Sequence, residues 1–514
     1  MLINAGQLLI ERAKTSPGLD AVVDAETGLR LTFSELNGST NQVAHALVSL
    51  GVQPGERVGV LMSNGVAYVQ VYFALLKIGA IAVLLNWRLT VEELSAQIED
   101  SQTGMLLYSI DHHALAEPLK CRIPGLAIIP STRHGAEASA ALDAVAASMP
   151  NSEPPISGQG DDVSFLIYTS GTTGKPKGAM HTHGSTINWS QCALATVEMR
   201  LADRGLILAP LFHVGGLALL INYIHRGCTS VIAKAFDAEQ IWQLIESERI
   251  NHSFAVPAMM SLMYRHPSRA SCNHASLRWI MVGAAPLPVS IIEEYAGIGI
   301  DLHQVYGSTE THGGICIIEP QYARSKAGST GKAYFGLEVR VVDSEGRDVE
   351  PGIPGEVITR GPHLIRGYWN QKEATEKAFK DGWFYLGDIA VIDKDGFIYI
   401  KDRSKDVIIS GGENIYPAEI ESALIRHPAV LDVAVIAQRS ERWGESPLAV
   451  VVADPEVLAA DVEVLKQEIL DLCRLHLARY KHPRAIEFVE ALPRNPTGKV
   501  LKHLLRERFT QSLS

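Results

Sequence analysis

Residues 168–178 read Tyr-Thr-Ser-Gly-Thr-Thr-Gly-Lys-Pro-Lys-Gly and continue the apolar run Val163–Tyr168. The apolar run predicts a buried strand, so the stretch is a loop at the carboxyl end of a strand, where open α/β sheets bind ligands. Its glycines let backbone N–H groups approach a ligand closely, while its hydroxyls and lysines add donors for phosphate oxygens. The loop therefore predicts an α/β fold with a polyphosphate site.

The loop is not a P-loop of the Walker A type. That pattern places four residues between its first glycine and a Gly-Lys pair, which Ser or Thr then follows. Here two residues separate Gly171 from Gly174, and Pro176, which has no backbone N–H, follows Lys175. The spacing excludes the kinase and P-loop interpretations. For this loop taken alone, a flexible surface turn is the alternative.

The composition is that of an ordinary soluble globular protein. A chain of 514 residues is too long for one hydrophobic core, which predicts two or more domains. Hydrophobic residues make up 46% and charged residues 20%, and the net charge of −11 argues against a nucleic-acid partner. No apolar run approaches the ~18 residues of a membrane helix. Glu11 and Arg12 end the short apolar stretch at the start, which argues against a signal peptide. We expect a cytoplasmic protein without a transmembrane segment.

The cysteines indicate neither a disulfide framework nor a zinc site. There are six, scattered without a C-x-x-C pair: Cys121, Cys192, Cys228, Cys272, Cys316 and Cys473. Most lie in apolar surroundings, as reduced core cysteines do.

Short β-branched runs alternate with longer amphipathic segments over the first two thirds of the chain. The predicted strands are 58–62, 80–85, 163–168, 253–256, 277–282 and 302–306, and the predicted helices are 68–78, 90–99 and 237–250. Thr90 and Asp237 are the expected helix N-caps. This alternation predicts α/β layers with largely parallel sheets. The stretch Ala136–Gly160, rich in Ala, Ser, Pro and Gly, is expected to be a long surface loop.

From Gly328 onward Gly, Pro and charged residues become frequent, and the predicted strands are short and antiparallel: 338–342, 355–359, 389–392 and 396–400. A compact remainder of roughly a hundred residues follows, within the usual size of a domain. It carries predicted helices at 417–425 and 462–477 and predicted strands at 433–436, 448–452 and 485–489. We expect an N-terminal domain over 1–402, a hinge at 403–406 and a C-terminal domain over 407–514.

Four further segments carry residues suited to nucleotide chemistry. The segment Tyr306-Gly307-Ser308-Thr309-Glu310 ends a predicted strand with a carboxylate, a hard ligand for Mg²⁺, and an aromatic face for a base. Asp388 in Gly387-Asp388 is able to accept from two vicinal hydroxyls. The paired glycines Gly411 and Gly412 allow a ligand to approach the backbone closely. Lys499 follows Pro-Thr-Gly near the C-terminus. Taken singly, each of these residues is more often a turn, core or solvated surface residue.

Together with the 168–178 loop and the segment Pro210–Gly216, these motifs resemble the adenylate-forming superfamily: acyl-CoA synthetases, luciferases and adenylation domains of peptide synthetases. These motifs occur in the family's order and spacing over nearly the whole chain. The resemblance implies a large N-terminal domain of layered α/β subdomains with a β-barrel-like part, and a small mobile α+β C-terminal domain. One departure is Leu386, where the family commonly has Thr before Gly-Asp.

The resemblance also implies roles for individual residues. The expected ATP-binding residues are Thr169, Ser170, Gly171, Thr172, Thr173, Gly174, Lys175, Lys177, Gly283, Ala284, Ala285, Pro286, Tyr306, Gly307, Ser308, Thr309, Asp388, Arg403 and Lys499. Among these, Tyr306 is expected to lie along adenine and Thr309 to touch the α-phosphate. Glu310 is expected to bind Mg²⁺, Asp388 the ribose, and Arg403 the ribose or phosphate. Lys499 is the expected mobile catalytic lysine, and its ammonium would stabilise charge at the α-phosphate. The expected catalytic set is Lys499, Thr309, Glu310 and His213.

The acyl pocket implied by the resemblance is lined by His213, Val214, Gly215, Gly283, Gly307, Gly313 and Gly314. Relatives that activate amino acids carry Asp where this chain has His213, which argues against an amino-acid substrate. The small residues on both walls suggest an elongated apolar acid. Gly411, Gly412 and Trp443 are expected to face coenzyme A, and Lys405 is the expected hinge residue.

The function implied is an ATP-dependent, AMP-forming acid–CoA ligase that uses ATP, Mg²⁺ and coenzyme A. The overall sequence pattern is most similar to that of bacterial fatty-acyl-CoA synthetases, so we expect a medium- or long-chain fatty acid. Aryl and phenylpropenoid acid–CoA ligases share every motif and are the alternative. A luciferase-like adenylating oxygenase is the alternative of a different class, and a non-catalytic ATP-binding module is disfavoured by the intact motifs. The partners are then small molecules, and whether the chain forms a homodimer stays open.

Overall fold

The computed structural model describes residues 3–131, 141–169, 176–285, 287–403, 405–410, 413–440, 443–494 and 500–510. Contacts divide the chain into two compact units. The first comprises Met1–Val339 and Thr359–Phe384, and the second comprises Arg340–Ile358 and Tyr385–Ser514. The expected hinge at 403–406 lies within the second unit, and its movement stays a prediction. Among the described residues, no helix combines the length and apolarity that a membrane crossing requires.

The first unit contains two large sheets whose central strands are parallel, as the sequence predicts. The nine-stranded sheet has the order β15-β14-β13-β12-β11-β9-β10-β1-β2. Its strands are β1 (Asp20–Asp24), β2 (Arg30–Thr32), β9 (Arg204–Ile207), β10 (Thr229–Ile232), β11 (His252–Ala255), β12 (Trp279–Val282), β13 (Asp301–Ser308), β14 (Gly313–Ile317) and β15 (Lys332–Ala333). The six-stranded sheet has the order β6-β5-β3-β4-β7-β8. Its strands are β3 (Arg57–Leu61), β4 (Ile81–Leu84), β5 (Met105–Ser109), β6 (Ala127–Ser131), β7 (Val163–Thr169) and β8 (Lys177–Thr182).

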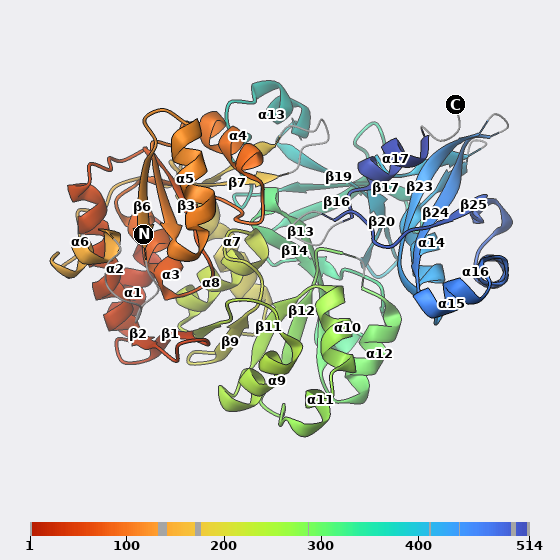
Figure 1. Cartoon of the computed structure of the whole chain (residues 1–514), viewed down its shortest axis with the longest axis horizontal. Helices are drawn as coiled ribbons and strands as arrows, with labels where there is room; N and C mark the ends of the chain where they lie inside the picture. Colours follow the sequence, from red (N-terminus) through yellow and green to blue (C-terminus); the bar gives the residue numbers. More distant parts are fainter. Residues whose placement is uncertain are drawn as a thin grey trace. The chain divides into compact units, whose positions relative to one another are not determined.

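Amphipathic helices cover these sheets (Figure 1). They are α1 (Gln7–Thr15), α2 (Phe33–Ser49), α3 (Val66–Lys77), α4 (Val91–Ser101), α5 (His113–Arg122), α7 (His183–Thr196), α8 (Val214–Arg226), α9 (Ala238–Ser247), α10 (Pro257–Arg265), α11 (Ser268–Ser271) and α12 (Val289–Gly297). Both expected N-caps are confirmed: Thr90 forms a capping box with Glu93, and Asp237 accepts the Gln240 N–H. The core between α9, α10, α12 and the nine-stranded sheet centres on Trp242, which is fully buried.

The expected loop at 136–160 contains a helix, α6 (Ala141–Ala147). Its alanines, which suggested a loop by composition, are strong helix formers. Leu142 and Ala146 stand four residues apart and are both buried, so they share one face that packs on the molecule. The contact that orders this segment is with α2, about a hundred residues earlier, and local composition carries no signal for it. Residues 132–140 lie outside the described chain.

Short antiparallel strands follow, as expected from Gly328 onward. They form a five-stranded sheet with the order β16-β17-β19-β18, in which β20 pairs with β19. Its strands are β16 (Glu338–Val342), β17 (Pro354–Arg360), β18 (Phe379–Lys380), β19 (Trp383–Ile392) and β20 (Ile398–Arg403), and α13 (Lys372–Ala378) precedes β18.

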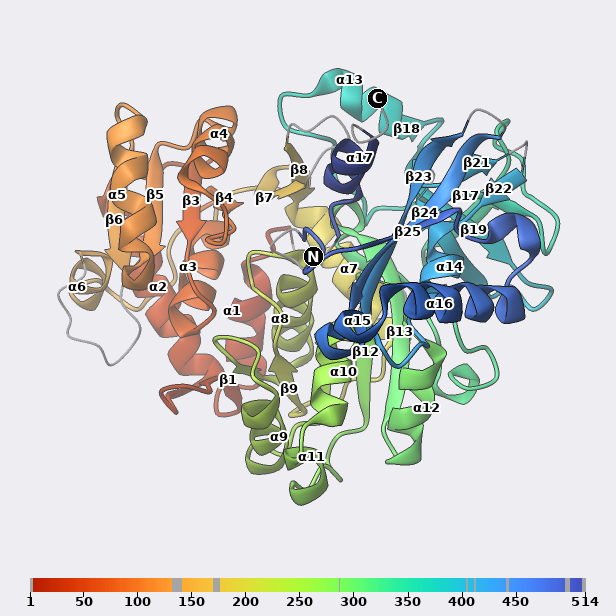
Figure 2. The ribbon, with the colours of Figure 1, turned by 45° about the vertical axis from the view of Figure 1, so that its right-hand side comes forward.

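The C-terminal part of the second unit is a sheet of order β22-β21-β24-β23, with β25 paired to β24 (Figure 2). Its elements are β21 (Ile408–Ser410), β22 (Glu413–Ile415), α14 (Pro417–Leu424), β23 (Val430–Ser440), β24 (Gly444–Ala453), α15 (Pro455–Ala460), α16 (Val462–His476), β25 (Ala485–Phe488) and α17 (Lys502–Thr510). Alternate residues of β23 face opposite sides: Val433 and Val435 pack with α14 and α16, whereas Ala434 and Ile436 pack with Leu505 of α17. The hairpin strands are longer than the predicted 433–436 and 448–452, because polar pairs continue the ladder beyond the apolar core.

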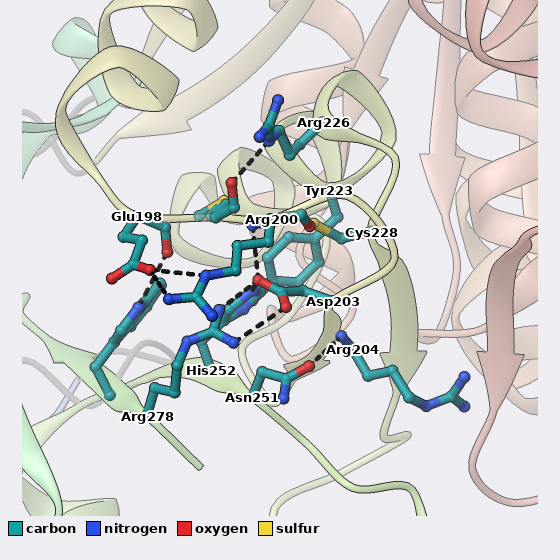
Figure 3. Close-up of polar contacts among 12 residues, drawn as sticks. Glu198, Arg200, Asp203, Arg204, Tyr223, Arg226, Cys228, Asn251, His252 and Arg278 are labelled. Atoms are coloured by element: carbon teal, nitrogen blue, oxygen red, sulfur yellow. Dashed lines mark hydrogen bonds and ion pairs between the residues drawn. The ribbon is translucent and has the colours of Figure 1, made fainter. Parts of the chain in front are cut away.

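A charged cluster lies at the amino ends of β9, β10 and β11, the edge opposite to the one where α/β sheets bind ligands (Figure 3). Asp203 is buried, and both of its oxygens accept from the Arg278 guanidinium. His252 Nε2 lies 3.4 Å from Asp203 Oδ2, and the Cys228 thiol donates to the Arg200 carbonyl. Among the described residues, Asp203, Cys228 and His252 form the one group of three side chains whose possible metal-ligand atoms lie close together.

The cluster is a buried ion pair rather than a metal centre. Arg278 already holds the Asp203 oxygens that a cation would need. Burial raises the pKa of the Cys228 thiol to about 12, so the thiolate that binds metals does not form at neutral pH. This agrees with the sequence interpretation of Cys228 as a core cysteine.

We expect Arg278→Met to lower the free energy of unfolding by about 3–5 kcal/mol, because it removes the guanidinium that neutralises the buried Asp203 carboxylate and leaves the Arg200 N–H and His252 beside it. Lys14→Met is the matched control: Lys14 pairs with Glu11 on the surface, where solvent screens a single ion pair and its loss changes stability little. Urea unfolding followed by tryptophan fluorescence measures both. Equal losses in the two variants would contradict the role of the Asp203 pair.

Candidate active site

The phosphate-type loop joins two paired strands. β7 is the last parallel strand of its sheet, and β8 returns antiparallel beside it, so that Thr169 stands opposite Lys177. Both side chains are half-buried. The loop therefore begins at the carboxyl end of a parallel strand, as predicted. Six of the expected ATP-binding residues, all from this loop, lie outside the described chain: Ser170, Gly171, Thr172, Thr173, Gly174 and Lys175.

Tyr368 connects the loop to the predicted magnesium ligand. The Lys177 ammonium lies 5.0 Å from the centroid of the Tyr368 ring, and the Tyr368 hydroxyl donates to Glu310 Oε1 at 3.0 Å. A cation and a carboxylate that are far apart in the sequence thus contact the same side chain. The motifs predicted roles for Lys177 and Glu310, and no spacing in the sequence indicated Tyr368. Such a pair of opposite charges suits a site that takes both a polyphosphate and its divalent cation.

The turn that carries Glu310 is held on both sides. The Ser308 N–H donates to Thr311 Oγ1 at 2.9 Å, which closes the short turn between β13 and β14. The Ile365 N–H donates to the Glu310 carbonyl at 3.1 Å. Thr309 is buried within the turn, and Tyr306 is half-buried near the end of β13. The turn therefore presents the Glu310 carboxylate from a fixed backbone.

Three buried histidines anchor the end of this turn. His312 Nδ1 donates to the His363 carbonyl at 2.7 Å, so its Nε2 is the acceptor and faces His181 Nδ1 at 3.0 Å. Burial lowers the pKa of His312 to about 3 and that of His363 to about 4, and it also lowers the pKa of His181. All three rings are therefore neutral at pH 7. The sequence interpretation missed this group.

Glycines allow the two strands that flank the turn to come together. Gly307 and Gly314 are paired across β13 and β14. A β-carbon built on Gly307 would lie 1.7 Å from the Gly313 carbonyl oxygen, and one built on Gly314 would lie 2.4 Å from the Tyr334 hydroxyl. Gly313 has a φ of +110°, which residues other than glycine rarely adopt. Glycine is thus required at Gly307 and Gly314 by the close approach of neighbouring atoms, and at Gly313 by the backbone angle.

His213 caps the N-terminus of α8. Its Nδ1 accepts the Gly215 N–H at 3.1 Å, and burial lowers its pKa to about 4. The ring is therefore a neutral imidazole whose proton is on Nε2. Val214 is buried, and β-carbons built on Gly215 and Gly283 would both approach the Phe254 ring, at 3.0 Å and 3.4 Å. The structure thus brings two of the expected acyl-pocket glycines to one aromatic side chain.

The 283–286 segment continues from β12. Ala284 has a φ of +68°, in the left-handed region that is strained for residues other than glycine, and Ala284 and Ala285 are exposed. Pro286 lies outside the described residues.

The remaining expected site residues belong to the second unit. Asp388 and Arg403 are paired across β19 and β20, with Arg403 Nε 2.7 Å from Asp388 Oδ1. Burial lowers the pKa of Lys405. Trp443 is exposed by 39% at the start of the segment leading into β24. Gly411, Gly412 and Lys499 lie outside the described residues.

Comparison with known proteins gives matches over nearly the whole chain. The family model described as AMP-binding enzyme matches residues 9–369, and the model described as AMP-binding enzyme C-terminal domain matches residues 419–499. The long-chain-fatty-acid–CoA ligase FadD13 of Mycobacterium tuberculosis is 41% identical over 510 residues, which cover 99% of each chain. The feruloyl-CoA synthase of Amycolatopsis sp is 39% identical over 513 residues, which cover 98% of this chain and 99% of the relative.

Solved structures show the same architecture. The O-succinylbenzoate coenzyme A synthetase of Bacillus subtilis, in complex with ATP and a magnesium ion, superposes with a TM-score of 0.85 at 31% identity. The match covers 97% of this chain and 99% of that chain. The expected α/β fold with a large N-terminal and a small C-terminal domain is thus confirmed.

Proposed function

Because this chain belongs to the AMP-binding enzyme family, we propose that a fatty acid is the carboxylic acid on which it acts. The chain is an AMP-forming acid–CoA ligase. The acid's carboxylate attacks the α-phosphorus of ATP, and pyrophosphate leaves. The CoA thiol then attacks the acyl carbon of the adenylate, and AMP leaves. Attack at phosphorus depends on positioning and on neutralising phosphate charge. Cations and N–H groups near the phosphates are therefore the residues to identify.

In the first unit, we assign the phosphates to Thr169, Lys177 and the loop between them. The observation that carries this assignment is the contact of Lys177, at the start of β8, and of Glu310 with the same side chain, Tyr368. Glu310 would hold Mg²⁺, since a carboxylate is the hard oxygen ligand this ion prefers. When bound, the ion neutralises charge on the phosphate oxygens. Tyr368 keeps one Glu310 oxygen in place, so the carboxylate need not reorganise during the reaction.

The remaining assigned contacts in the first unit follow the family motifs. We assign Tyr306 and the 283–286 segment to adenine, and Thr309 to the α-phosphate. Thr309 is buried in the turn that the Ser308–Thr311 hydrogen bond closes, so the backbone that carries its hydroxyl is held in place.

In the second unit, we assign Asp388 and Arg403 to the ribose and α-phosphate. These two side chains pair with each other, so binding of ribose hydroxyls and phosphate at this position would replace that ion pair. We further propose that Lys405 is the hinge about which the small domain moves between the two half-reactions, and that Lys499 serves the first of them. Gly411, Gly412 and Trp443 would face coenzyme A in the second.

The state of His213 supports an acid without a charged α-substituent. A neutral imidazole with its proton on Nε2 offers one hydrogen bond and no negative charge. An α-ammonium group placed there would be desolvated without a counter-ion. We favour a medium- or long-chain fatty acid, in line with FadD13, and keep an aryl acid second, in line with the feruloyl-CoA synthase. We place the enzyme in the cytoplasm.

Pyrophosphate release from ATP, measured with a panel of acids with and without CoA, tests the proposal. The panel contains straight-chain fatty acids, cinnamic-type acids, and the matched pair 3-phenylpropanoate and phenylalanine, which differ by the α-ammonium group alone. We expect fatty acids to give the highest kcat/KM, 3-phenylpropanoate to react and phenylalanine not to react. Highest activity with the cinnamic-type acids would favour the aryl ligase. Turnover that does not form a CoA thioester would contradict the ligase reaction itself.

A further inference from the structure

One buried tryptophan lies against the glycines assigned to the acyl pocket. Trp189 on α7 is exposed by 2%, and its indole Nε1–H donates to the Gly314 carbonyl at 2.9 Å. A β-carbon built on Gly313 would lie 3.6 Å from Cζ2 of the same indole. The sequence interpretation named Gly313 and Gly314 as room for an elongated acid. In the structure, the space beside them is bounded by an aromatic ring.

Two residues of α8 bound the same space from another side. The β-carbon built on Gly313 would lie 3.6 Å from Ala218 Cβ and 3.8 Å from Val214 Cγ2. These are ordinary van der Waals distances, so the space beside Gly313 accommodates about one methyl group. Val214 and Ala218 stand four residues apart on one face of the helix. Trp189, Val214 and Ala218 therefore close the space in front of Gly313.

The indole is held rigidly. Besides its hydrogen bond to Gly314, its ring stacks on His312, with centroids 6.4 Å apart and planes 21° apart. His312 is itself fixed between the His363 carbonyl and His181. A side chain with two independent restraints does not swing aside at little cost, in contrast to an exposed aromatic ring.

From this arrangement we infer that Trp189 is the residue that sets the upper length of the acid this enzyme activates. The inference rests on the proposed function, because it takes Val214, Gly313 and Gly314 as acyl-pocket residues. The acid's chain extends from His213 along α8 toward Gly313 and meets the indole there. Trp189 is thus a specificity-determining residue that acts on the far end of the substrate and takes no part in the chemical steps.

The expected effect follows from apolar burial. Each methylene that the pocket can take up adds about 0.8 kcal/mol of binding, which corresponds to about a fourfold gain in kcat/KM. Trp189→Leu removes the ring system and extends the space beside Gly313. Trp189→Phe keeps a ring but loses the hydrogen bond to the Gly314 carbonyl. We expect the leucine variant to shift the optimum to longer acids and the phenylalanine variant to shift it less.

The experiment measures kcat/KM for pyrophosphate release with straight-chain acids and with ω-phenylalkanoic acids of increasing length. Trp242→Leu is the matched control. Trp242 is equally buried, and its Nε1–H also donates to a backbone carbonyl, that of Met263, but it lies in the core beneath the nine-stranded sheet. We expect this control to lower thermal stability and to leave the length profile unchanged. Thermal melting of each variant identifies any that fails to fold.

A profile that shifts in Trp189→Leu and not in Trp242→Leu supports the inference. Superimposable profiles for wild type and a folded Trp189→Leu variant overturn it while leaving the ligase assignment intact; if the leucine variant does not fold, the same result with Trp189→Phe overturns it. A shift of the same size in Trp242→Leu also overturns it, because the change then reflects general loosening. A wild-type enzyme that activates neither acid series contradicts the proposed function, and with it this inference.

Discussion

Lys499→Ala is expected to abolish formation of the acyl-adenylate while leaving thioester formation from supplied acyl-adenylate at the wild-type rate. In the proposed reaction, the Lys499 ammonium pairs with the substrate carboxylate and the α-phosphate as charge shifts between them. Removal of one such electrostatic contact commonly lowers kcat by about 10²–10³. The second half-reaction expels AMP by thiol attack at carbon and needs no cation at that point. The asymmetry is therefore the signature of two states sharing one active site.

Two assays separate the half-reactions. Pyrophosphate exchange with acid and ATP reports the first, and release of AMP from synthetic acyl-adenylate and CoA reports the second. Lys466→Ala is the control, because Lys466 is also a lysine of the second unit and pairs on the surface with Glu463. It should leave both rates unchanged. Equal loss of both half-reactions in Lys499→Ala would refute the role assigned to this lysine.

Local patterns predicted much of the fold. The Val163–Tyr168 run became β7, and Thr90 and Asp237 cap their helices, because alternation and capping are recorded in neighbouring residues. The α6 helix was missed because the contact that stabilises it is chiefly with α2, about a hundred residues earlier in the chain. An argument from helix propensity weighs only the local preferences of the residues. A seven-residue helix is too short to be stable by propensity alone and depends on tertiary packing.

The candidate site shows the same contrast between local patterns, which the sequence records, and long-range contacts, which it does not. Glu310 was predicted as a metal ligand because it follows a strand in a recognisable motif, and that role stays a prediction. Tyr368, which holds its carboxylate, and Trp189, which lies against Gly313, come from segments with no motif. His312 was passed over because a histidine next to a motif is ordinary in sequence. Its role arises from a carbonyl 51 residues away. The turn that carries Glu310 is thus supported by long-range contacts between residues of common types.

We expect the first unit to unfold steeply in mild acid, near pH 5. His183, His312 and His363 are buried, and burial lowers their pKa values to about 4, 3 and 4. In the unfolded chain a histidine has a pKa of about 6.5. Below that pH the unfolded state binds protons that the folded state does not, so stability falls as the pH falls from 6.5 toward 4. At pH 5 each of the three removes about 2 kcal/mol, or about 6 kcal/mol together. That loss matches the total stability of many domains, about 5–15 kcal/mol.

The measurement is the free energy of unfolding in urea between pH 7 and pH 5, followed by tryptophan fluorescence. Six of the seven tryptophans lie in the first unit, so the signal reports chiefly on that unit. The three rings alone predict a slope of about 4 kcal/mol per pH unit near pH 5, and His213 and His225, whose pKa values burial also lowers to about 4, add to it in the same direction. Carboxylates with a lowered pKa, such as Asp203, lose their contribution only below about pH 4. The window between pH 5 and 6.5 therefore isolates the histidines.

His363→Gln sharpens the test, because the glutamine amide can replace the ring Nε2, which lies 3.4 Å from Thr359 Oγ1, and does not titrate. It should reduce the slope by about one proton, or about 1.4 kcal/mol per pH unit. His113→Gln is the control, since His113 is exposed at the start of α5, and it should leave the slope unchanged. A wild-type slope that corresponds to less than one proton would mean that the buried rings take up protons without unfolding. The neutral state that anchors the Glu310 turn would then not be what holds this unit together.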